Sequence, residues 1–460
     1  LYLERAPLKE PGMTSWEIFL SESQERMVLA VEEDSLPELR ELSETYETEL
    51  TELGESDDSG ILKVWHDGHL VCELDNSRLH DAPIRQLKAE FRPAPESAGV
   101  TWESGDLGAD LLALLGDFAV GSREPIIREY DHEVQGNTVL KPLAGAVGDA
   151  PQDGSVIRVD GSEKLMAMGL ALLPEWGKSD PFAMGTATVD ECVRALVACG
   201  ADPAQIALLD NFCVGNPEDP RELGMLVETC KGIAAAAEVF AAPFVSGKDS
   251  FYNYFETDDG PVSIPTTCLI SGMGVVDQAA HVTGASVRGA GNSLFVLGAT
   301  GGEMGGSVYA RYCGSPGSAV PATDLNTAAA DYTKFHRAVV EGLVLSAHDL
   351  SEGGLAVAAA EMGFSMKAGL EIDLNQLPVN AELGDVQRLF AETPSRLLIE
   401  AAPEAKGRLE EIFAGSKFAR VGSTVAEHAA LKLRSGEQQL IDLPLSELTD
   451  RWKNCLTPYY

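Results

Sequence analysis

The sequence has no hydrophobic run long enough to cross a membrane. No apolar stretch in its 460 residues approaches the roughly 18 residues that a membrane helix needs, and no secretory h-region is present. Membrane partners and secretion are therefore not indicated. We expect a soluble protein of the cytoplasm.

Positive charge is also scarce. The chain has 34 Lys and Arg against 72 Asp and Glu, which gives a formal net charge of −38. Binding the phosphate backbone of a nucleic acid requires a surplus of cationic side chains. We therefore expect no nucleic-acid partner.

Ordered groups of cysteine or histidine are missing as well. The eight cysteines form no C-x-x-C pair, so neither a disulfide framework nor a zinc site is indicated, and we expect buried, reduced thiols. The eight histidines are scattered without an H-x-x-x-H pair, so their spacing supports no catalytic triad. Residues 176–179 imitate the end of a P-loop, but Leu172 stands where its first glycine belongs.

The sequence does contain an internal repeat. At an offset of 370, residues 20–29 correspond to 390–399: Leu20 with Phe390, Glu22 with Glu392, Arg26 with Arg396, Met27 with Leu397 and Leu29 with Ile399. The agreement resumes at an offset of 369 or 370, from Leu62 with Leu431 to Asp81 with Asp450. We infer two copies of one structural unit.

The two copies differ inside this segment. We interpret Ser395 as the counterpart of Gln24 in the second copy, and Pro394 as the counterpart of Ser23. A duplicated enzyme that keeps one working site and lets the other decay would differ in this way. Drift at an exposed turn explains the difference equally well.

The repeat period is too long for the chain to contain twice. We therefore expect a fragment in which roughly 270 residues of the first copy precede Leu1. The expected domains are 1–90 as the end of the first copy's C-terminal domain, 91–135 as a linker, 136–286 as the second copy's N-terminal domain and 287–460 as its C-terminal domain. The predicted fold class is α+β, a tandem duplicated two-domain unit with a truncated first copy.

Local patterns predict the elements that carry the candidate site. We expect a strand at 27–31, a helical stretch at 36–53, a hairpin at 60–74 with Asp67-Gly68 as its turn, and Asp190 as a helix N-cap. Strands at 205–210 and 243–246 flank a helix at 221–241. Two strand ends separated by one helix can face a common crevice, where α/β proteins bind ligands.

The chemistry concentrates at those two strand ends. Gly247-Lys248-Asp249-Ser250 offers close backbone approach, a cation and a hydroxyl, which suits a phosphate, although a plain tight turn would look the same. Asp210 at the neighbouring strand end supplies the carboxylate that a magnesium-nucleotide site needs.

Two further glycine-rich segments are ambiguous. Residues 298–307 could cradle a phosphate or form a flexible turn. For residues 348–354 we favour a structural interpretation, with Ser351 as an N-cap and the glycines allowing close helix packing.

Several motifs, taken in order, resemble the phosphoribosylformylglycinamidine synthase family of purine biosynthesis. They are residues 21–27, 130–136, 216–218, 245–253 and 348–354. The resemblance implies a tandem duplication of the two-domain unit found singly in aminoimidazole ribonucleotide synthetase. It also implies an ATP-dependent ligase that converts formylglycinamide ribonucleotide to the amidine through an iminophosphate, with ATP and Mg²⁺ as cofactors.

The same resemblance assigns roles to residues. Glu22, Ser23, Gln24 and Ser250 would bind the substrate, and Asp210 and Gly247 the nucleotide. Lys248 stands where shorter members have a magnesium-binding Asn; because a Lys cannot ligate a cation, a metal role there is doubtful and a direct phosphate contact is the alternative. The family's catalytic histidine and main magnesium carboxylates match no position of this chain, so the chain alone is expected to bind ADP or ATP without forming amidine.

The resemblance also implies partners. Ammonia would come from a separate glutaminase subunit, with a small adaptor subunit in the complex. Two other functions remain open: a single-copy ATP-dependent synthetase of the same superfamily, against which the repeat argues, and a nucleotide-binding scaffold without turnover.

Overall fold

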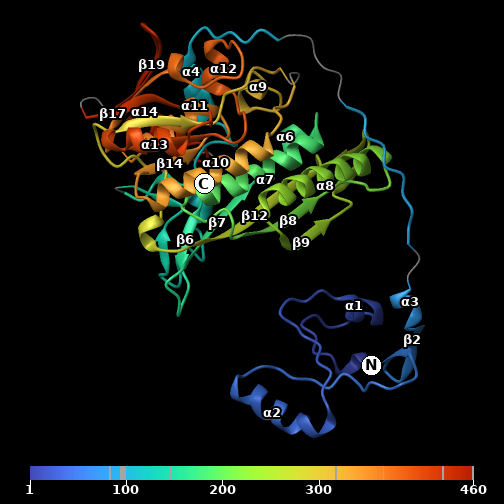
Figure 1. The fold of residues 1–460 in the computed structure, drawn as a ribbon. Helices are drawn as coiled ribbons and strands as arrows, with labels where there is room; N and C mark the ends of the chain where they lie inside the picture. Colours follow the sequence, from blue (N-terminus) through green and yellow to red (C-terminus); the bar gives the residue numbers. More distant parts are fainter. Residues whose placement is uncertain are drawn as a thin grey trace. The chain divides into compact units, whose positions relative to one another are not determined.

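The computed structural model describes residues 1–81, 84–93, 100–145, 147–315, 319–365, 367–426 and 429–457. The chain divides into two compact units, Leu1–Gln86 and Leu87–Tyr460 (Figure 1). Among the described residues, no helix combines the length and the apolar character that crossing a membrane demands.

The Leu1–Gln86 unit is small and built around a hairpin. Its elements in order are η1 (Leu3–Arg5), α1 (Ser15–Leu20), η2 (Glu33–Ser35), α2 (Leu36–Thr45), β1 (Ile61–His66), β2 (His69–Asp75) and α3 (Ser77–His80). Asp67 and Gly68 both have positive φ, 50° and 75°, as a type I′ turn requires. The predicted hairpin is therefore confirmed, and the predicted helical stretch at 36–53 is shorter, ending at Thr45.

The Leu87–Tyr460 unit begins with a six-stranded sheet in the order β3-β6-β7-β12-β8-β9. The strands are β3 (Thr138–Leu140), β6 (Ser155–Arg158), β7 (Leu165–Ala171), β12 (Thr267–Val276), β8 (Ile206–Cys213) and β9 (Phe244–Ser250). Only the β8–β9 pair is parallel, and α8 (Pro220–Phe240) connects the two. Helix α7 (Pro181–Ala198) packs on β7 and β12, since a Cβ at Gly272 would lie 2.8 Å from Cys192 and Leu196 atoms.

Helices α7 and α8 cross closely because glycines meet at the crossing. A Cβ at Gly185 would lie 2.6 Å from the Thr229 carbonyl oxygen, and one at Gly232 would lie 2.3 Å from that of Phe182. Side chains at both positions would push the helices apart. The crossing therefore fixes where α8 begins relative to the end of β8.

A seven-stranded sheet follows, in the order β14-β16-β13-β17-β15-β18-β19. Its strands are β13 (Ser293–Leu297), β14 (Ser346–Asp349), β15 (Gly369–Asp373), β16 (Leu397–Ala401), β17 (Phe418–Val425), β18 (Ala430–Ser435) and β19 (Gln438–Pro444). The main helices are α10 (Leu325–Val340), α11 (Gly354–Gly363), α12 (Asp385–Phe390), α13 (Lys406–Ile412) and α14 (Leu445–Lys453). Buried residues of α10 and α13 pack on one face of this sheet, and those of α11 and α14 on the other.

Short elements complete this unit. They are α4 (Leu107–Leu115), α5 (Glu124–Ile127), α6 (Pro174–Gly177), α9 (Val308–Tyr312), β4 (Leu143–Ala144), β5 (Ala150–Pro151), β10 (Tyr254–Thr257), β11 (Gly260–Ser263), η3 (Ala279–His281), η4 (Leu374–Gln376) and η5 (Pro403–Ala405). Phe240 of α8 stacks on Tyr332 of α10 with ring centroids 5.8 Å apart, so the core beneath the first sheet continues to α10.

The internal repeat is confirmed by the order and spacing of elements. At an offset of 370, α1, η2 and the start of α2 correspond to α12, η5 and the start of α13; at 369, β1 and β2 correspond to β18 and β19. The interpretation that paired Gln24 with Ser395 is wrong by one residue. Glu25 and Ser395 share the left-handed backbone, with φ of 61° and 62°, so Gln24 corresponds to Pro394.

The strand expected at 27–31 is absent. These residues lie outside any helix or strand, and Met27 and Val28 are 85% and 87% exposed. Their counterpart β16 is buried because it pairs with β13 and β14. In the described part of the Leu1–Gln86 unit no strand pairs with 27–31, and a segment without ladder partners gains nothing by extending.

Two capping predictions are also wrong. The N-cap of α7 is Asp180, whose Oδ1 accepts from the Ala183 N–H at 2.9 Å, while Asp190 lies fully buried in mid-helix. The N-cap of α11 is Gly353, with φ of 76°, rather than Ser351. The predicted close packing is confirmed, because a Cβ at Gly354 would lie 2.6 Å from the Ala391 carbonyl oxygen.

Candidate functional site

The parallel ends of β8 and β9 bring Asp210 and Gly247 together. The two residues are paired in register, and a Cβ at Gly247 would lie 2.3 Å from Asp210 Oδ1, so a side chain at this position would displace the carboxylate. Burial, and then the neighbouring Asp249, raise the pKa of Asp210, whereas the backbone N–H of Lys248 lowers it by hydrogen bonding. The carboxylates of Asp210 and Asp249 thus lie close together at the strand end, and a bound cation would reduce the repulsion between them.

Lys248 and Ser250 lie together on the opposite face of β9. Lys248 Nζ donates to Ser250 Oγ, and strand alternation separates this pair from Gly247. Because β9 is an edge strand of its sheet, a ligand could contact both pairs only by passing around that edge. The structure therefore forms two pairs from these four candidate residues, rather than one cluster.

A polar hollow of about 590 Å³ lies at the start of α8. Its lining combines both signs of charge and consists of Glu90, Arg92, Asn216, Glu218, Asp219, Pro220 and Arg221. The loop is shaped by its own side chains: Asn216 Oδ1 accepts from the Glu218 N–H at 2.9 Å, and Tyr252 OH lies 3.2 Å from Glu218 Oε1. The lining holds three carboxylates against two guanidinium groups, and Arg92 lies 3.5 Å from Glu90, so it does not mark this helix start as an anion site.

The remaining candidates, Glu22, Ser23 and Gln24, lie in the Leu1–Gln86 unit. They form an exposed turn after α1, in which Arg26 donates to the Ser21 carbonyl oxygen at 3.2 Å and the Ser21 and Ser23 hydroxyls are 3.0 Å apart. These three residues lie next to one another in this turn. That they bind the same substrate as Ser250 stays a prediction.

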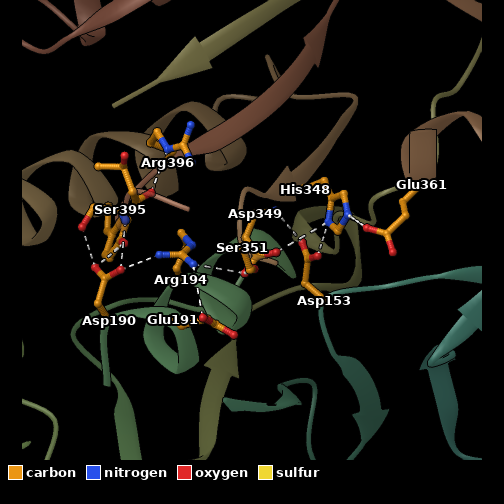
Figure 2. A network of polar contacts seen from close by, with 12 residues as sticks. Asp153, Asp190, Glu191, Arg194, His348, Asp349, Ser351, Glu361, Ser395 and Arg396 are labelled. Carbon is orange, nitrogen blue, oxygen red and sulfur yellow. Dashed lines mark hydrogen bonds and ion pairs between the residues drawn. The ribbon is translucent and has the colours of Figure 1, made fainter. Parts of the chain in front are cut away.

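Sequence reasoning missed a buried polar network between α7, α10 and the turn before β16 (Figure 2). Asp190 accepts from Tyr332 OH at 2.6 Å, from the Ser395 N–H at 3.0 Å and from Ser395 Oγ at 2.8 Å, and it also pairs with Arg194. Arg194 continues to Asp349 Oδ2 at 3.5 Å. The sequence did contain one signal of this network, an Asp and an Arg four residues apart on an otherwise apolar helix face.

Beside this network lies a cavity of about 10 Å³, which is room for one water molecule. Three carboxyl groups line it, and burial is the main cause of their raised pKa values: about 7 for Glu352, about 8 for Glu392 and well above the usual value for Glu191. Trp176 Nε1 and Arg194 Nε have no partner in the described part of the chain. A water accepting from these donors fits this cavity, and a nucleotide does not.

His348 lies buried between two carboxylates (Figure 2). Its Nδ1 contacts Asp153 Oδ1, and its Nε2 lies 2.9 Å from Glu361 Oε2. Asp153, His348 and Asp349 are close enough to share an ion, but both ring nitrogens face carboxylates, as they do in an imidazolium, which has no lone pair for a metal. We interpret the group as an ion-pair cluster.

We expect the His348 cluster to make stability fall as pH rises. Burial alone would lower the pKa of His348, but Asp153 and Glu361 raise it well above its usual value, while burial raises the pKa of Asp153 to about 6. Both groups hold protons in the folded state that the unfolded chain releases earlier, so the contribution is complete in acid and is lost above the folded pKa values.

The measurement is the free energy of urea unfolding between pH 5 and 9, for the wild type and for His348→Gln. The difference between the two should shrink as pH rises. A difference that grows with pH would contradict a buried imidazolium.

The glycine-rich residues 298–307 use several backbone amides internally. The N–H groups of Thr300, Gly301 and Gly305 donate to the Pro378 carbonyl, Thr393 Oγ1 and the Ala319 carbonyl, at 2.9 to 3.0 Å. Amides already paired in this way are not free to cradle a phosphate. The structural interpretation of this segment is favoured.

Comparison with known families identifies two related domains. The family model described as AIR synthase related protein, C-terminal domain, matches residues 1–67 and 289–433, and the corresponding N-terminal domain model matches residues 151–275.

Curated relatives carry one recurrent name. A protein of Methanocaldococcus jannaschii named phosphoribosylformylglycinamidine synthase subunit PurL is 34% identical over 98% of this chain and 60% of its own length. The protein of the same name from Lactobacillus helveticus is 30% identical over 99% of this chain and 59% of its own length. This chain thus spans about 60% of the length of these relatives.

Solved structures share the fold. The structure titled T. maritima PurL complexed with FGAR has a TM-score of 0.59 at 17% identity, covering 74% of this chain and 53% of that one. The complex of the same protein with ATP has a TM-score of 0.55 at 17% identity, covering 74% and 51%.

Proposed function

The chain belongs to the family of AIR synthase related proteins and is homologous over nearly its whole length to the PurL subunits of phosphoribosylformylglycinamidine synthase, and from this premise we propose that it is part of an ATP-dependent ligase of purine biosynthesis. The reaction would convert formylglycinamide ribonucleotide and ammonia into the amidine. The family expected from the sequence and the α+β fold class are both confirmed.

The observation that carries this proposal is the extent of the homology, 34% identity over 98% of the chain. The T. maritima structures support it, since they are complexes of a protein with this fold with FGAR and with ATP. Formylglycinamide ribonucleotide, ATP and cytoplasmic location are accordingly proposed for this chain as well. The glutaminase and adaptor subunits are proposed partners.

We assign the nucleotide to Asp210 and Gly247. The absence of a side chain at Gly247 leaves the Asp210 carboxylate room at the strand end, and Asp249 beside it adds negative charge. These carboxylates fit Mg²⁺, which when bound would neutralise phosphoryl charge. Lys248 is a cation and does not ligate the metal. Its ammonium group donates to Ser250 Oγ on the opposite face of β9, so its contact with a phosphate would require a ligand that passes around that edge.

The test uses the intact subunit that carries this sequence, supplied with formylglycinamide ribonucleotide, ATP, Mg²⁺ and ammonium salt. Amidine and ADP should form in equal amounts. Retention of one nucleotide per chain without amidine would support a scaffold instead. ADP formation that requires a different ribonucleotide would identify another synthetase of the superfamily.

A further inference from the structure

Residues 87–92, here called the strap, lie outside any helix or strand and run past the start of α8 (Figure 1). The Glu90 N–H donates to the Pro220 carbonyl oxygen at 2.7 Å. A Cβ at Gly224 would lie 2.4 Å from the carbonyl carbon and oxygen of Glu90 and 2.8 Å from the Phe91 nitrogen. The backbone of the strap therefore rests directly on the first turns of α8, in space that a side chain at position 224 would fill.

The charged side chains of the strap pair with one another. Glu90 forms ion pairs with Lys88 and, at 3.5 Å, with Arg92. Lys88 and Arg92 are exposed, as is Leu87 at the beginning of the strap. A segment that is held by backbone contacts and keeps exposed side chains can leave α8 at a low cost in free energy.

The loop between β8 and α8 is tied to the end of β9. Tyr252, just beyond β9, has its OH 3.2 Å from Glu218 Oε1, and its N–H donates to the Gly215 carbonyl oxygen at 2.7 Å. Asn253 Nδ2 donates to the Ser250 carbonyl oxygen at 2.8 Å. Hydrogen bonds thus connect the start of α8 with the strand that carries part of the candidate nucleotide site.

The strap also forms a wall of the polar hollow at the start of α8. Two lining residues, Glu90 and Arg92, belong to the strap, and three, Asn216, Glu218 and Asp219, belong to the loop between β8 and α8. A strap that left α8 would expose this loop to solvent and remove one of its supports.

We propose that the strap positions the nucleotide site: docked on α8, it holds the loop between β8 and α8 in the conformation that binds the nucleotide. This inference rests on the proposed assignment of the nucleotide to Asp210 and Gly247. The element with two states is the strap itself, docked or released. Coupling between two sites is reciprocal, so a bound nucleotide holds the strap on α8 in return.

Trypsin measures the docking, because the Lys88-Ala89 bond lies inside the strap. The bond after Arg92 is not a second site, since proline follows it and trypsin does not cleave before proline. Cleavage of a segment that must first open follows the population of the open form. In the 460-residue chain, saturating ATP with Mg²⁺ should slow cleavage at Lys88 about tenfold, a usual size for coupling between sites. Asp210→Ala should abolish this protection.

Two variants release the strap, one from each side of the contact. Gly224→Leu fills the space beneath Glu90, and Glu90→Pro removes the N–H that donates to Pro220. Each should speed cleavage at Lys88, measured relative to the same chain unfolded in urea, and weaken ATP binding about tenfold, the factor by which ATP protects the wild type. Gly407→Leu is the control and should change neither quantity, because no atom lies within 4 Å of a Cβ at that position.

Each unfavourable outcome has its own meaning. A wild type that binds no ATP, or Asp210→Ala that binds ATP normally, overturns the proposed nucleotide site and the inference with it. If ATP binds through Asp210 but Gly224→Leu and Glu90→Pro keep the affinity of the wild type, the inference alone is wrong. It is also wrong if neither variant speeds cleavage at Lys88, because the strap is then not held by its contact with α8.

Discussion

Replacing Asp190 with alanine should lower the free energy of unfolding of the Leu87–Tyr460 unit by about 3–5 kcal/mol. Asp190 is fully buried and accepts from Tyr332, from the backbone and hydroxyl of Ser395, and from Arg194. Its removal leaves the buried Arg194 guanidinium with longer ion pairs, to Asp349 at 3.5 Å and to Glu191 at 3.8 Å. Most of the loss is the penalty of a buried charge that is less well compensated.

Urea unfolding followed by circular dichroism measures this loss. Asp180→Ala is the matched control, because it removes an Asp from the same helix at its N-cap and should cost only about 1 kcal/mol. The double variant Asp190→Asn with Arg194→Met should recover part of the loss by removing the charge. A cost below that of the Asp180 control would show that the network adds little to stability.

Gly247→Ala should weaken nucleotide binding up to about a hundredfold, because losing a contact to a charged group costs about 3 kcal/mol at most. The added Cβ would lie 2.3 Å from Asp210 Oδ1, so the carboxylate must rotate or the strand end must move. Either change displaces the group assigned to the nucleotide. The fold should survive, because β9 is an edge strand and Gly247 is exposed.

Isothermal titration of ATP with Mg²⁺ into wild type and variant measures the effect. Gly407→Ala is the matched control, because no atom lies within 4 Å of its added Cβ and its backbone lies outside the left-handed region. That variant should bind ATP normally. Unchanged ATP affinity in Gly247→Ala would remove Asp210 and Gly247 from the proposed nucleotide site.

Local patterns sufficed wherever neighbouring residues determine structure. The Asp67-Gly68 turn and the succession of β8, α8 and β9 follow from turn chemistry and apolar periodicity, and that succession places Asp210 beside Gly247. What failed depended on distant partners. Asp is a residue type that often caps helices, so the sequence suggested an N-cap at Asp190. Its hydrogen bonds with Tyr332 and Ser395, which come from other elements, place it at the centre of a network instead.

The repeat shows a different limit. Residue identities alone left the pairing of Gln24 uncertain by one position, because Ser and Pro are both plausible counterparts of Gln in a turn. Backbone geometry removes the ambiguity, since Glu25 and Ser395 share a conformation that few non-glycine residues adopt.

The exposed run at residues 27–31 has a consequence for handling the protein. Met-Val-Leu-Ala-Val is apolar, uncharged and free of proline, and its first two residues are more than four-fifths exposed. Short segments of this composition can stack with identical segments of other molecules into cross-β assemblies. Arg26 on one side and Glu32 and Glu33 on the other act as gatekeepers against such stacking. Because salt screens those charges, we expect the protein to aggregate at lower protein concentration as the ionic strength rises.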